Sequence, residues 1–289
     1  MKDALIVSML SVVPKNPTAR LMGRGARIRL PSFLHRALVR WFVKKYQVDL
    51  SECEGGIDDF DSLASFFVRG LKPGVRPVDP DPDALVSPVD ARVHTVGDII
   101  DGTFVQSDGQ RSSVPLLVGV GDPRTPGVPA ELGARFEGGT FAVLYLSPKD
   151  YHRVHVPADC TIAATTYLPG ALWPVFPAAT RKVRDLFGVN ERLVFHLDTP
   201  FGPMAEVMVG AFGVGRMSTV LDDAVTNTGG AGRHQALDPA PPFDRAQELG
   251  RFELGSTVIL LAEKGALDWT IQPGEPVRLG RPIARRAGA

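Results

Sequence analysis

The chain has 289 residues, of which 44% are hydrophobic and 22% charged, and this composition excludes general disorder and supplies enough core for one large or two modest domains. Lys plus Arg and Asp plus Glu number 32 each, so no overall positive charge points to nucleic acid, and we expect no nucleic-acid partner. The two cysteines, Cys53 and Cys160, are too few for a disulfide framework and favour a reducing compartment.

The charge is distributed unevenly along the chain. Residues 1–48 contain ten Lys and Arg against one acid, a net charge of +9, and the remainder carries −9. The apolar stretch 4–13 has about half of the roughly 20 residues needed to span a bilayer, and it lacks the charged start and the cleavage site of a signal peptide. We therefore expect a basic N-terminal segment attached to an acidic body, without a membrane-spanning helix or secretion.

Residues 31–46 are predicted to form an amphipathic helix, because Pro31 and Ser32 suit a helix start and apolar side chains recur on one arc. That arc contains Phe33, Leu34, Ala37, Leu38, Trp41 and Phe42, and a narrow cationic edge contains Arg36, Arg40 and Lys44. With the basic run 20–29 before it, such a helix suits an anionic membrane surface. Packing on the acidic body is the alternative. We predict a basic, membrane-associating helical region at 1–56.

Beyond residue 56 the pattern changes from helical to strand-like. Residues 60–69 suggest one short helix, and the Pro-rich stretch 72–83 suggests an extended connection. From residue 84 onward, short apolar runs alternate with Gly, Pro and Asp, as in strands and turns: 85–89, 92–97, 115–120, 140–146, 153–157, 204–215 and 257–263. Helical pattern there is weak apart from 179–187. The sequence predicts an α+β fold, with a β-rich domain at 57–289 behind the helical region.

Two motifs contain residue types that can perform acid–base chemistry. In YHRVH (151–155), His152 and His155 are three residues apart, so in an extended strand they face opposite sides and are poorly placed to share a metal. We expect no metal site. One histidine can act as a general base while the other acts in a separate step. Alternatively, both can be merely hydrogen-bonded. Asp90 ends the run SPVD at a turn, where it can orient an imidazole or simply cap the turn.

A third motif, LGST (254–257), precedes an apolar run near the C-terminus. Glycine within a strand usually marks a bulge. With a base nearby, however, the Ser256 hydroxyl can attack the carbonyl of Gly255, because glycine lacks the Cβ that resists a strained conformation. That N→O acyl shift makes an ester. Elimination then gives dehydroalanine, and hydrolysis leaves a pyruvoyl group at a new N-terminus.

In combination, these motifs resemble phosphatidylserine decarboxylase, specifically the bacterial, mitochondrial-related type with N-terminal membrane helices. The matching stretches occur in one order from near residue 1 to about residue 283. They are 60–77, SPVDARV (87–93), YLSPKDYHRVHVP (145–157), NER (190–192), FGPMAEVMVGAFGVG (201–215) and GRFELGSTV (250–258). LGST and YHRVH are specific when they occur together.

The resemblance implies that the chain is a proenzyme that cleaves itself between Gly255 and Ser256. The products are a β chain, 1–255, and an α chain, 256–289, which form a heterodimer; a further homo-oligomer is left open. Ser256 becomes a covalent pyruvoyl group, the only cofactor implied. Asp90, His155 and Ser256 match a charge-relay triad for self-cleavage, and His152 matches a residue of the decarboxylation step.

The implied substrate is phosphatidylserine, whose amine forms a Schiff base with the pyruvoyl carbonyl and loses CO2 to give phosphatidylethanolamine, a step of phospholipid biosynthesis. The implied location is peripheral, on the cytoplasmic face of the cell membrane, where anionic lipid attracts the +9 segment. Two departures from the family pattern are Ala91, where glycine is usual, and the loop 170–177, which has Phe176 where asparagine is common. The loop bears on substrate preference.

Two other classes of function stay open from the residues alone. A serine hydrolase would use Asp90, His155 and Ser256 against an external ester or amide and would keep its chain intact. A non-catalytic, membrane-binding β module would also stay intact, and it would be indifferent to Ser256→Ala.

Overall fold

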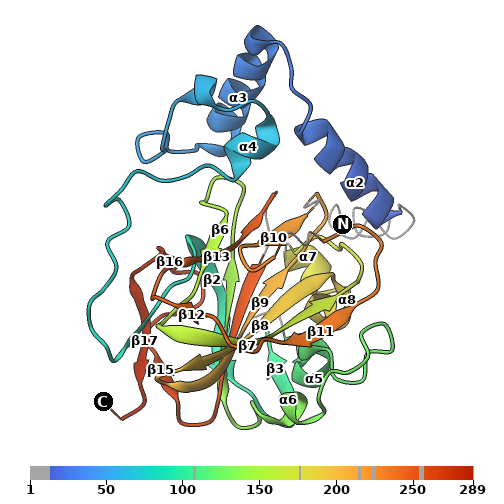
Figure 1. Ribbon diagram of the computed structural model, residues 1–289, viewed down its shortest axis with the longest axis vertical. Coiled ribbons are helices and arrows are strands. Elements are labelled where there is room, and N and C mark those ends of the chain that lie inside the picture. Colours follow the sequence, from blue (N-terminus) through green and yellow to red (C-terminus); the bar gives the residue numbers. More distant parts are fainter. Residues whose placement is uncertain are drawn as a thin grey trace.

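The computed structural model describes residues 14–106, 109–175, 177–213, 216–222, 226–253 and 257–288. The helices are α2 (Lys15–Ala26), α3 (Ser32–Tyr46), the 3-10 turn η1 (Ile57–Asp59), α4 (Leu63–Phe67), α5 (Val114–Val118), α6 (Glu131–Ala134), α7 (Pro177–Thr180) and α8 (Leu186–Val189). The first four precede the strands and lie at one end of the molecule (Figure 1).

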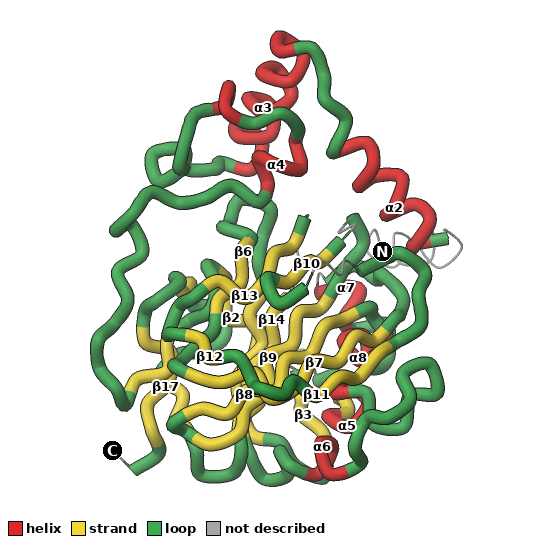
Figure 2. The backbone as a smooth tube through the Cα atoms, viewed as in Figure 1, coloured by secondary structure: helices red, strands yellow, loops and turns green. Residues whose placement is uncertain are grey.

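The strands are β1 (Ala84–Val86), β2 (Ala91–Asp98), β3 (Thr103–Val105), β4 (Arg111–Ser113), β5 (Thr140–Tyr145), β6 (Arg153–His155), β7 (Cys160–Leu168), β8 (Arg192–Thr199), β9 (Gly202–Val209), β10 (Met217–Thr219), β11 (Arg233–Ala236), β12 (Pro242–Phe243), β13 (Glu248–Phe252), β14 (Thr257–Ala262), β15 (Leu267–Trp269), β16 (Pro276–Val277) and β17 (Pro282–Arg286). They form the body below the helices (Figure 2). The predicted α+β class is confirmed.

The body is built on one nine-stranded antiparallel sheet. Its order is β11-β7-β8-β9-β14-β5-β2-β16, with β12 also paired to β7. The central strand β14 is buried at all six positions, which explains why TVILLA is apolar without alternation. It pairs with β9 and β5 at once, so that Thr257 lies opposite both Val209 and Tyr145. The start of β14 is therefore held rigidly in the core.

A second, three-stranded sheet, β10-β13-β6, stands beside the main one. Strand β13 pairs antiparallel with β6, so that Glu248 lies opposite His155 and Arg251 opposite Arg153. The chain passes from β13 directly to β14, between Phe252 and Thr257. The described residues before LGST therefore lie beside the YHRVH motif.

Helix α3 packs on α4 and not on the sheet. Val39 and Phe42 of α3 join Val48, Phe66 and Phe67 in a small core of their own, which includes residues on both sides of the predicted boundary at 56. Most of the remaining apolar arc is open: Phe33, Leu34 and Trp41 are 67%, 46% and 53% exposed, whereas Leu38 is half-buried. One helix thus has a packed side and an exposed apolar side.

The predictions of individual helices and strands are mostly confirmed. Residues 60–69 contain α4, which Ser62 caps by accepting a hydrogen bond from the Ser65 N–H, and 179–187 overlaps α7 and α8. The predicted strand at 115–120 is wrong. That segment forms α5, because the Ser113 side chain accepts from the Leu116 N–H and Pro115 suits the first turn. Gly119, at φ +93°, then ends the helix.

Within the described ranges, no helix combines the length and the apolar character needed to cross a bilayer. The apolar stretch 4–13 lies outside those ranges.

Candidate active site

Asp90 is buried directly before β2, where it is held by a cation and an amide. The Arg76 guanidinium donates from Nε to both carboxylate oxygens, at 2.9 and 3.1 Å, and from a terminal nitrogen at 2.5 Å. The Leu279 N–H donates to Oδ1 at 2.9 Å. Arg76 also donates to Glu52 at 2.7 Å, and this hydrogen bond lowers the pKa of Glu52. The Asp90 carboxylate is therefore held in position by an ion-pair network.

The family departure at Ala91 is accommodated without strain. Ala91 is the first residue of β2, pairs with Val277 of β16 and is not among the residues with positive φ. The backbone here does not need glycine. Phe176, the other departure, lies outside the described residues.

His155 is buried on β6 with both ring nitrogens engaged. Nδ1 lies 2.8 Å from the carbonyl oxygen of Ala246, and Nε2 lies 3.2 Å from the Tyr151 hydroxyl. A carbonyl oxygen can only accept a hydrogen bond, so Nδ1 carries the proton. Nε2 is then unprotonated, and its lone pair accepts a hydrogen bond from the Tyr151 hydroxyl. Burial lowers the pKa of His155. The ring is thus neutral at pH 7, with its basic nitrogen at Nε2.

Asp90 and His155 are neighbours in the fold, yet their side chains are not hydrogen-bonded to each other. The backbone N–H of His155 donates to the Pro88 carbonyl at 3.0 Å, so the SPVD segment runs beside β6. The Asp90 carboxylate, however, faces Arg76, and the tautomer that we expected Asp90 to fix is set by the Ala246 carbonyl. Ala246 has the left-handed φ of 61°, which is uncommon for a residue other than glycine.

His152 occupies a different environment from His155. It is fully buried, its ring stacks on Phe67 of α4 at a centroid distance of 4.0 Å, and Nε2 donates to the Ser147 carbonyl at 3.0 Å. Burial lowers the pKa of His152 to about 3. Among the described residues, Nδ1 has no hydrogen-bond partner. His152 is therefore a neutral ring with an unused acceptor.

Gly255 and Ser256 lie outside the described residues, but both flanks of this pair are described. On one side, the Phe252 N–H donates to the His152 carbonyl at 3.0 Å. On the other, Thr257 is buried and pairs with Tyr145 and Val209. The described residues before the predicted cleavage segment therefore lie beside β6, which carries His155, and beside His152, which directly precedes that strand.

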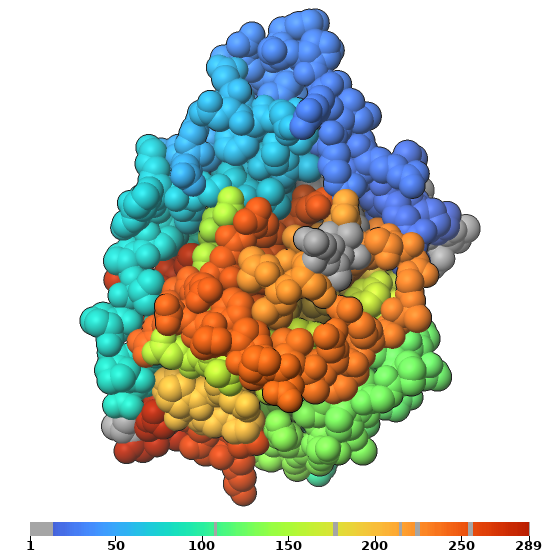
Figure 3. Space-filling model, in the orientation of Figure 1, coloured from blue at the N-terminus to red at the C-terminus, as the bar shows by residue number. Residues whose placement is uncertain are grey.

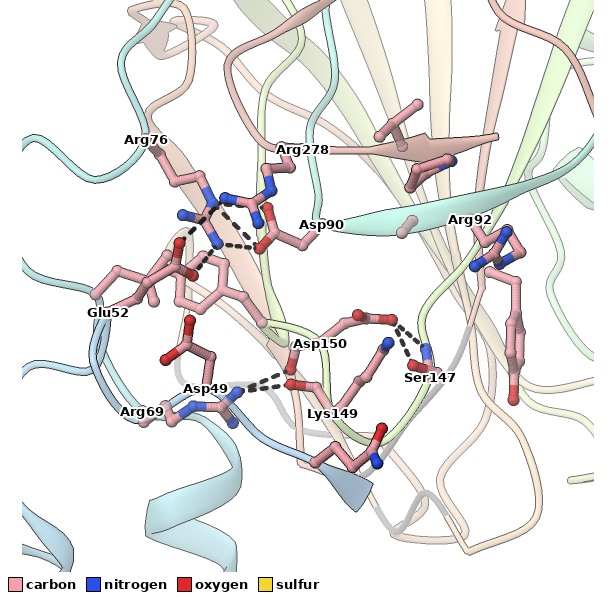
Figure 4. A pocket seen from close by; sticks show the side chains of 17 residues that line it. Asp49, Glu52, Arg69, Arg76, Asp90, Arg92, Ser147, Lys149, Asp150 and Arg278 are labelled. Atoms are coloured by element: carbon pink, nitrogen blue, oxygen red, sulfur yellow. Dashed lines mark hydrogen bonds and ion pairs between the residues drawn. The ribbon is translucent and has the colours of Figure 1, made fainter. Parts of the chain in front are cut away.

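A pocket of 340 Å³, called here the Asp90 pocket, adjoins these residues (Figure 4). It lies between the segment after α3 and strands β2, β5 and β16, and Tyr145 and Tyr151 line it. Its charged lining has both signs: Arg69, Arg76, Arg92, Lys149 and Arg278 against Asp49, Glu52, Asp90 and Asp150. Such a lining suits a small polar ligand that carries both charges.

Sequence reasoning missed three residues of this site. Arg76 and Tyr151 lie inside matched motifs, and the position of Tyr151 directly before His152 was the available signal. The sequence carried no signal for Ala246, because this residue contacts His155 through its backbone carbonyl.

Comparison with known proteins finds relatives over almost the full length of the chain. The family model described as phosphatidylserine decarboxylase matches residues 63–285. The chain is 41% identical to the phosphatidylserine decarboxylase proenzyme of Myxococcus xanthus, covering 98% of this chain and 99% of the relative. It is 42% identical to that of an Anaeromyxobacter species, covering 99% and 100%, and 41% identical to that of Aliivibrio salmonicida, covering 99% and 100%. The chain belongs to the phosphatidylserine decarboxylase family.

Proposed function

We propose that this chain is the proenzyme of a pyruvoyl-dependent phosphatidylserine decarboxylase. It cleaves itself between Gly255 and Ser256, and the joined β chain (1–255) and α chain (256–289) convert phosphatidylserine to phosphatidylethanolamine and CO2. The observation that carries this proposal is the similarity, over almost the whole length of both chains, to relatives named proenzymes of that activity. The neutral His155, on the strand that pairs with β13, supports the chemistry.

In the self-cleavage step, His155 acts as the general base. Its Nε2 takes the Ser256 hydroxyl proton while the oxygen attacks the Gly255 carbonyl carbon, and the amide C–N bond breaks as its nitrogen is protonated. The resulting ester loses the Ser256 α proton and the Gly255 carboxylate. Water then converts the dehydroalanine to a keto group and releases ammonia. This step needs the His155 tautomer described above, in which Nδ1–H donates to the Ala246 carbonyl and Nε2 is unprotonated.

Asp90 is the third member of the proposed triad. For direct contact, the His155 Nδ1–H must exchange the Ala246 carbonyl for the Asp90 carboxylate, and Asp90 must loosen its contact with Arg76. The carboxylate would then stabilise the imidazolium that forms when His155 takes the proton. Glu52 can stay ion-paired with Arg76 during that exchange, because its carboxylate already accepts a hydrogen bond from Arg76 at 2.7 Å.

The residues present fit a pyruvoyl group at position 256. His152 has an acceptor atom, Nδ1, without a partner in the described part of the chain, and Phe67 covers the ring and excludes water. When formed, the pyruvoyl group supplies a carbonyl that takes up the electrons released as CO2 departs. Nδ1 of His152 can accept a hydrogen bond from the amine of the substrate and orient it. The Asp90 pocket then offers cations to the substrate carboxylate.

The N-terminal helices support a peripheral location on the cytoplasmic face of the membrane. Exposed apolar side chains gather there: Leu21, Met22, Ile28, Phe33, Leu34 and Trp41. Arg24, Arg40 and Lys44 are exposed among them. In the space-filling view this region, in blue, forms one end of the molecule (Figure 3). Apolar side chains inserted between lipids and cations on anionic headgroups would act together.

The decisive test of function is incubation of the purified protein with vesicles of phosphatidylserine and phosphatidylcholine. We expect stoichiometric CO2 and phosphatidylethanolamine, and neither product from phosphatidylcholine alone. An intact chain that forms no phosphatidylethanolamine but reacts with a serine-directed phosphonate would instead establish the hydrolase.

His152→Ala is expected to separate the two steps. Since His155 is unchanged, the variant should cleave normally, whereas decarboxylation should fall by about 10²-fold or more because the substrate amine loses its acceptor. Mass spectrometry of the chains and a CO2 assay on the same sample measure both. His234→Gln, a half-buried histidine on β11, is the matched control. An unprocessed His152→Ala chain that is folded would contradict this division of roles.

A further inference from the structure

A second pocket, called here the arginine pocket, lies between α2 and the body and also measures 340 Å³. Arg20 and Arg24 of α2 and Arg27, directly after that helix, line it at helical spacing, and Arg216 lines it from the segment before β10. Thr226 and Thr228 complete the wall. No carboxylate is among its described lining residues, in contrast to the Asp90 pocket.

The four guanidinium groups of the arginine pocket have little negative charge to pair with. Arg27 is ion-paired with Glu253, and Arg216 lies 3.8 Å from the same carboxylate. Arg20 donates only to neutral oxygens of Asn227, at 2.9 and 3.1 Å. Arg24 has no acidic partner in the described part of the chain. Arg20 also interacts electrostatically with the buried Glu191 carboxylate. Four clustered cations near only two carboxylates favour an anionic ligand, and guanidinium groups match the oxygens of a phosphate.

An apolar pocket of 410 Å³ adjoins the arginine pocket and shares Thr226 and Thr228 with it. Tyr167 and Leu193 line it from the sheet, and Leu221 lines it from the segment after β10. In Figure 3 the surface is hollowed where the orange residues after β10 border the sheet. A cationic pocket next to an apolar one fits an amphiphile that has a phosphate at one end and an alkyl chain at the other.

The arginine pocket also borders Glu253, the last described residue before the predicted cleavage site. Glu253, which Arg27 and Arg216 share, lies two residues before Gly255, and its N–H donates to the Arg216 carbonyl at 3.0 Å. A ligand whose phosphate lies among the arginines would therefore lie close to Glu253.

We propose that the arginine pocket binds the phosphodiester of the glycerophospholipid substrate and that the apolar pocket takes the start of one acyl chain. This proposal rests on the proposed function for the identity of the headgroup. Binding of the lipid phosphate depends only on the described residues.

The binding test uses the full-length Ser256→Ala chain, which cannot turn over substrate, with three probes in calorimetry: inorganic phosphate, glycerophosphoserine and monomeric dihexanoylphosphatidylserine. We expect dihexanoylphosphatidylserine to bind at least tenfold more tightly than glycerophosphoserine. The double change Arg20→Gln and Arg24→Gln should weaken both at least tenfold, and added salt should weaken both as well. Arg111→Gln, an exposed arginine on β4, is the matched control. Leu221→Asn should weaken only the dihexanoyl lipid.

Three outcomes are informative. Unchanged lipid binding by the double arginine variant, with its fold intact by circular dichroism, would overturn the proposal. Equal affinity for inorganic phosphate and the lipid, without an effect of Leu221→Asn, would reduce the site to one for free phosphate and would overturn the lipid assignment. Lipid binding that depends on the arginines, together with a wild-type protein that makes no phosphatidylethanolamine, would contradict the proposed function and leave the lipid site standing.

A kinetic test on the processed enzyme separates the two proposals further. Arg24→Gln should raise KM for phosphatidylserine at least fivefold, while kcat stays within twofold, because the phosphate contact is made in the ground state and the transition state alike. An unchanged KM with normal turnover would overturn the lipid site alone.

Discussion

The Ser256→Ala chain is expected to remain whole at full length, whereas the wild-type chain separates under denaturing conditions into 1–255 and 256–289. The reason is chemical: alanine has no hydroxyl to attack the Gly255 carbonyl, so neither the ester nor the keto group can form. Decarboxylation should therefore be lost entirely. Intact-mass spectrometry measures the cleavage, and a hydrazine that labels carbonyls should mark only the wild-type fragment that begins at residue 256.

Ser218→Ala is the matched control for this change. Ser218 lies on β10, is half-buried and pairs with Arg251 of β13, so it tests whether removing a nearby hydroxyl by itself stops the reaction. We expect normal processing. Cleavage of Ser256→Ala at the wild-type rate would contradict the mechanism, and a wild-type chain that stays whole would favour the hydrolase or the binding module.

The fold could be predicted where local pattern and burial agree. The apolar run at 257–263 corresponds to β14, whose two neighbouring strands bury every side chain. Residues 31–46 correspond to α3 almost to the residue. The prediction failed at 115–120, where an apolar run is too short to distinguish a strand from a helix by periodicity. There the Ser113 cap and the left-handed Gly119 decide in favour of α5.

The site was predictable only where residue type itself determines the chemistry. His152, His155 and Asp90 stood out because imidazoles and carboxylates transfer protons and orient one another. The partners of these groups could not be read from the sequence, since they arise from long-range packing. Asp90 meets the Leu279 amide 189 residues later in the chain, and His155 meets the Ala246 carbonyl 91 residues later. Any residue type can offer such a backbone group.

Replacing His155 by alanine is expected to slow self-cleavage by about 10²–10⁴-fold, the usual effect of losing a positioned general base. The reaction depends on the lone pair at Nε2, and among the described neighbours only Tyr151 contacts that atom. Time courses of newly synthesised chain, followed by gel or mass spectrometry, give the rate. Added imidazole should restore part of it to His155→Ala, because a free base can enter the space left by the ring.

The pH dependence provides an independent check on the same residue. Burial lowers the pKa of His155 below its ordinary value of 6.5, so the ring stays neutral, and the cleavage rate should stay level, as the pH falls past 6.5. The rate should decline only when the pH passes through the lowered pKa. The same shift means that stability present above pH 6.5 is lost as the pH falls through the pKa of the folded state, so circular dichroism must show folded protein at each point.

Tyr151→Phe separates the role of His155 as the base from the role of the tyrosine hydroxyl bonded to it. It removes the hydroxyl that donates to Nε2 at 3.2 Å but leaves His155 and the Ala246 carbonyl in place, so cleavage should continue within about tenfold of the wild-type rate. Folded His155→Ala that cleaves as fast as wild type, or an acid midpoint at or above pH 6.5 in folded protein, would mean that another group takes the Ser256 proton. The ordered tautomer of His155 would then be a structural feature of β6 and not part of the reaction.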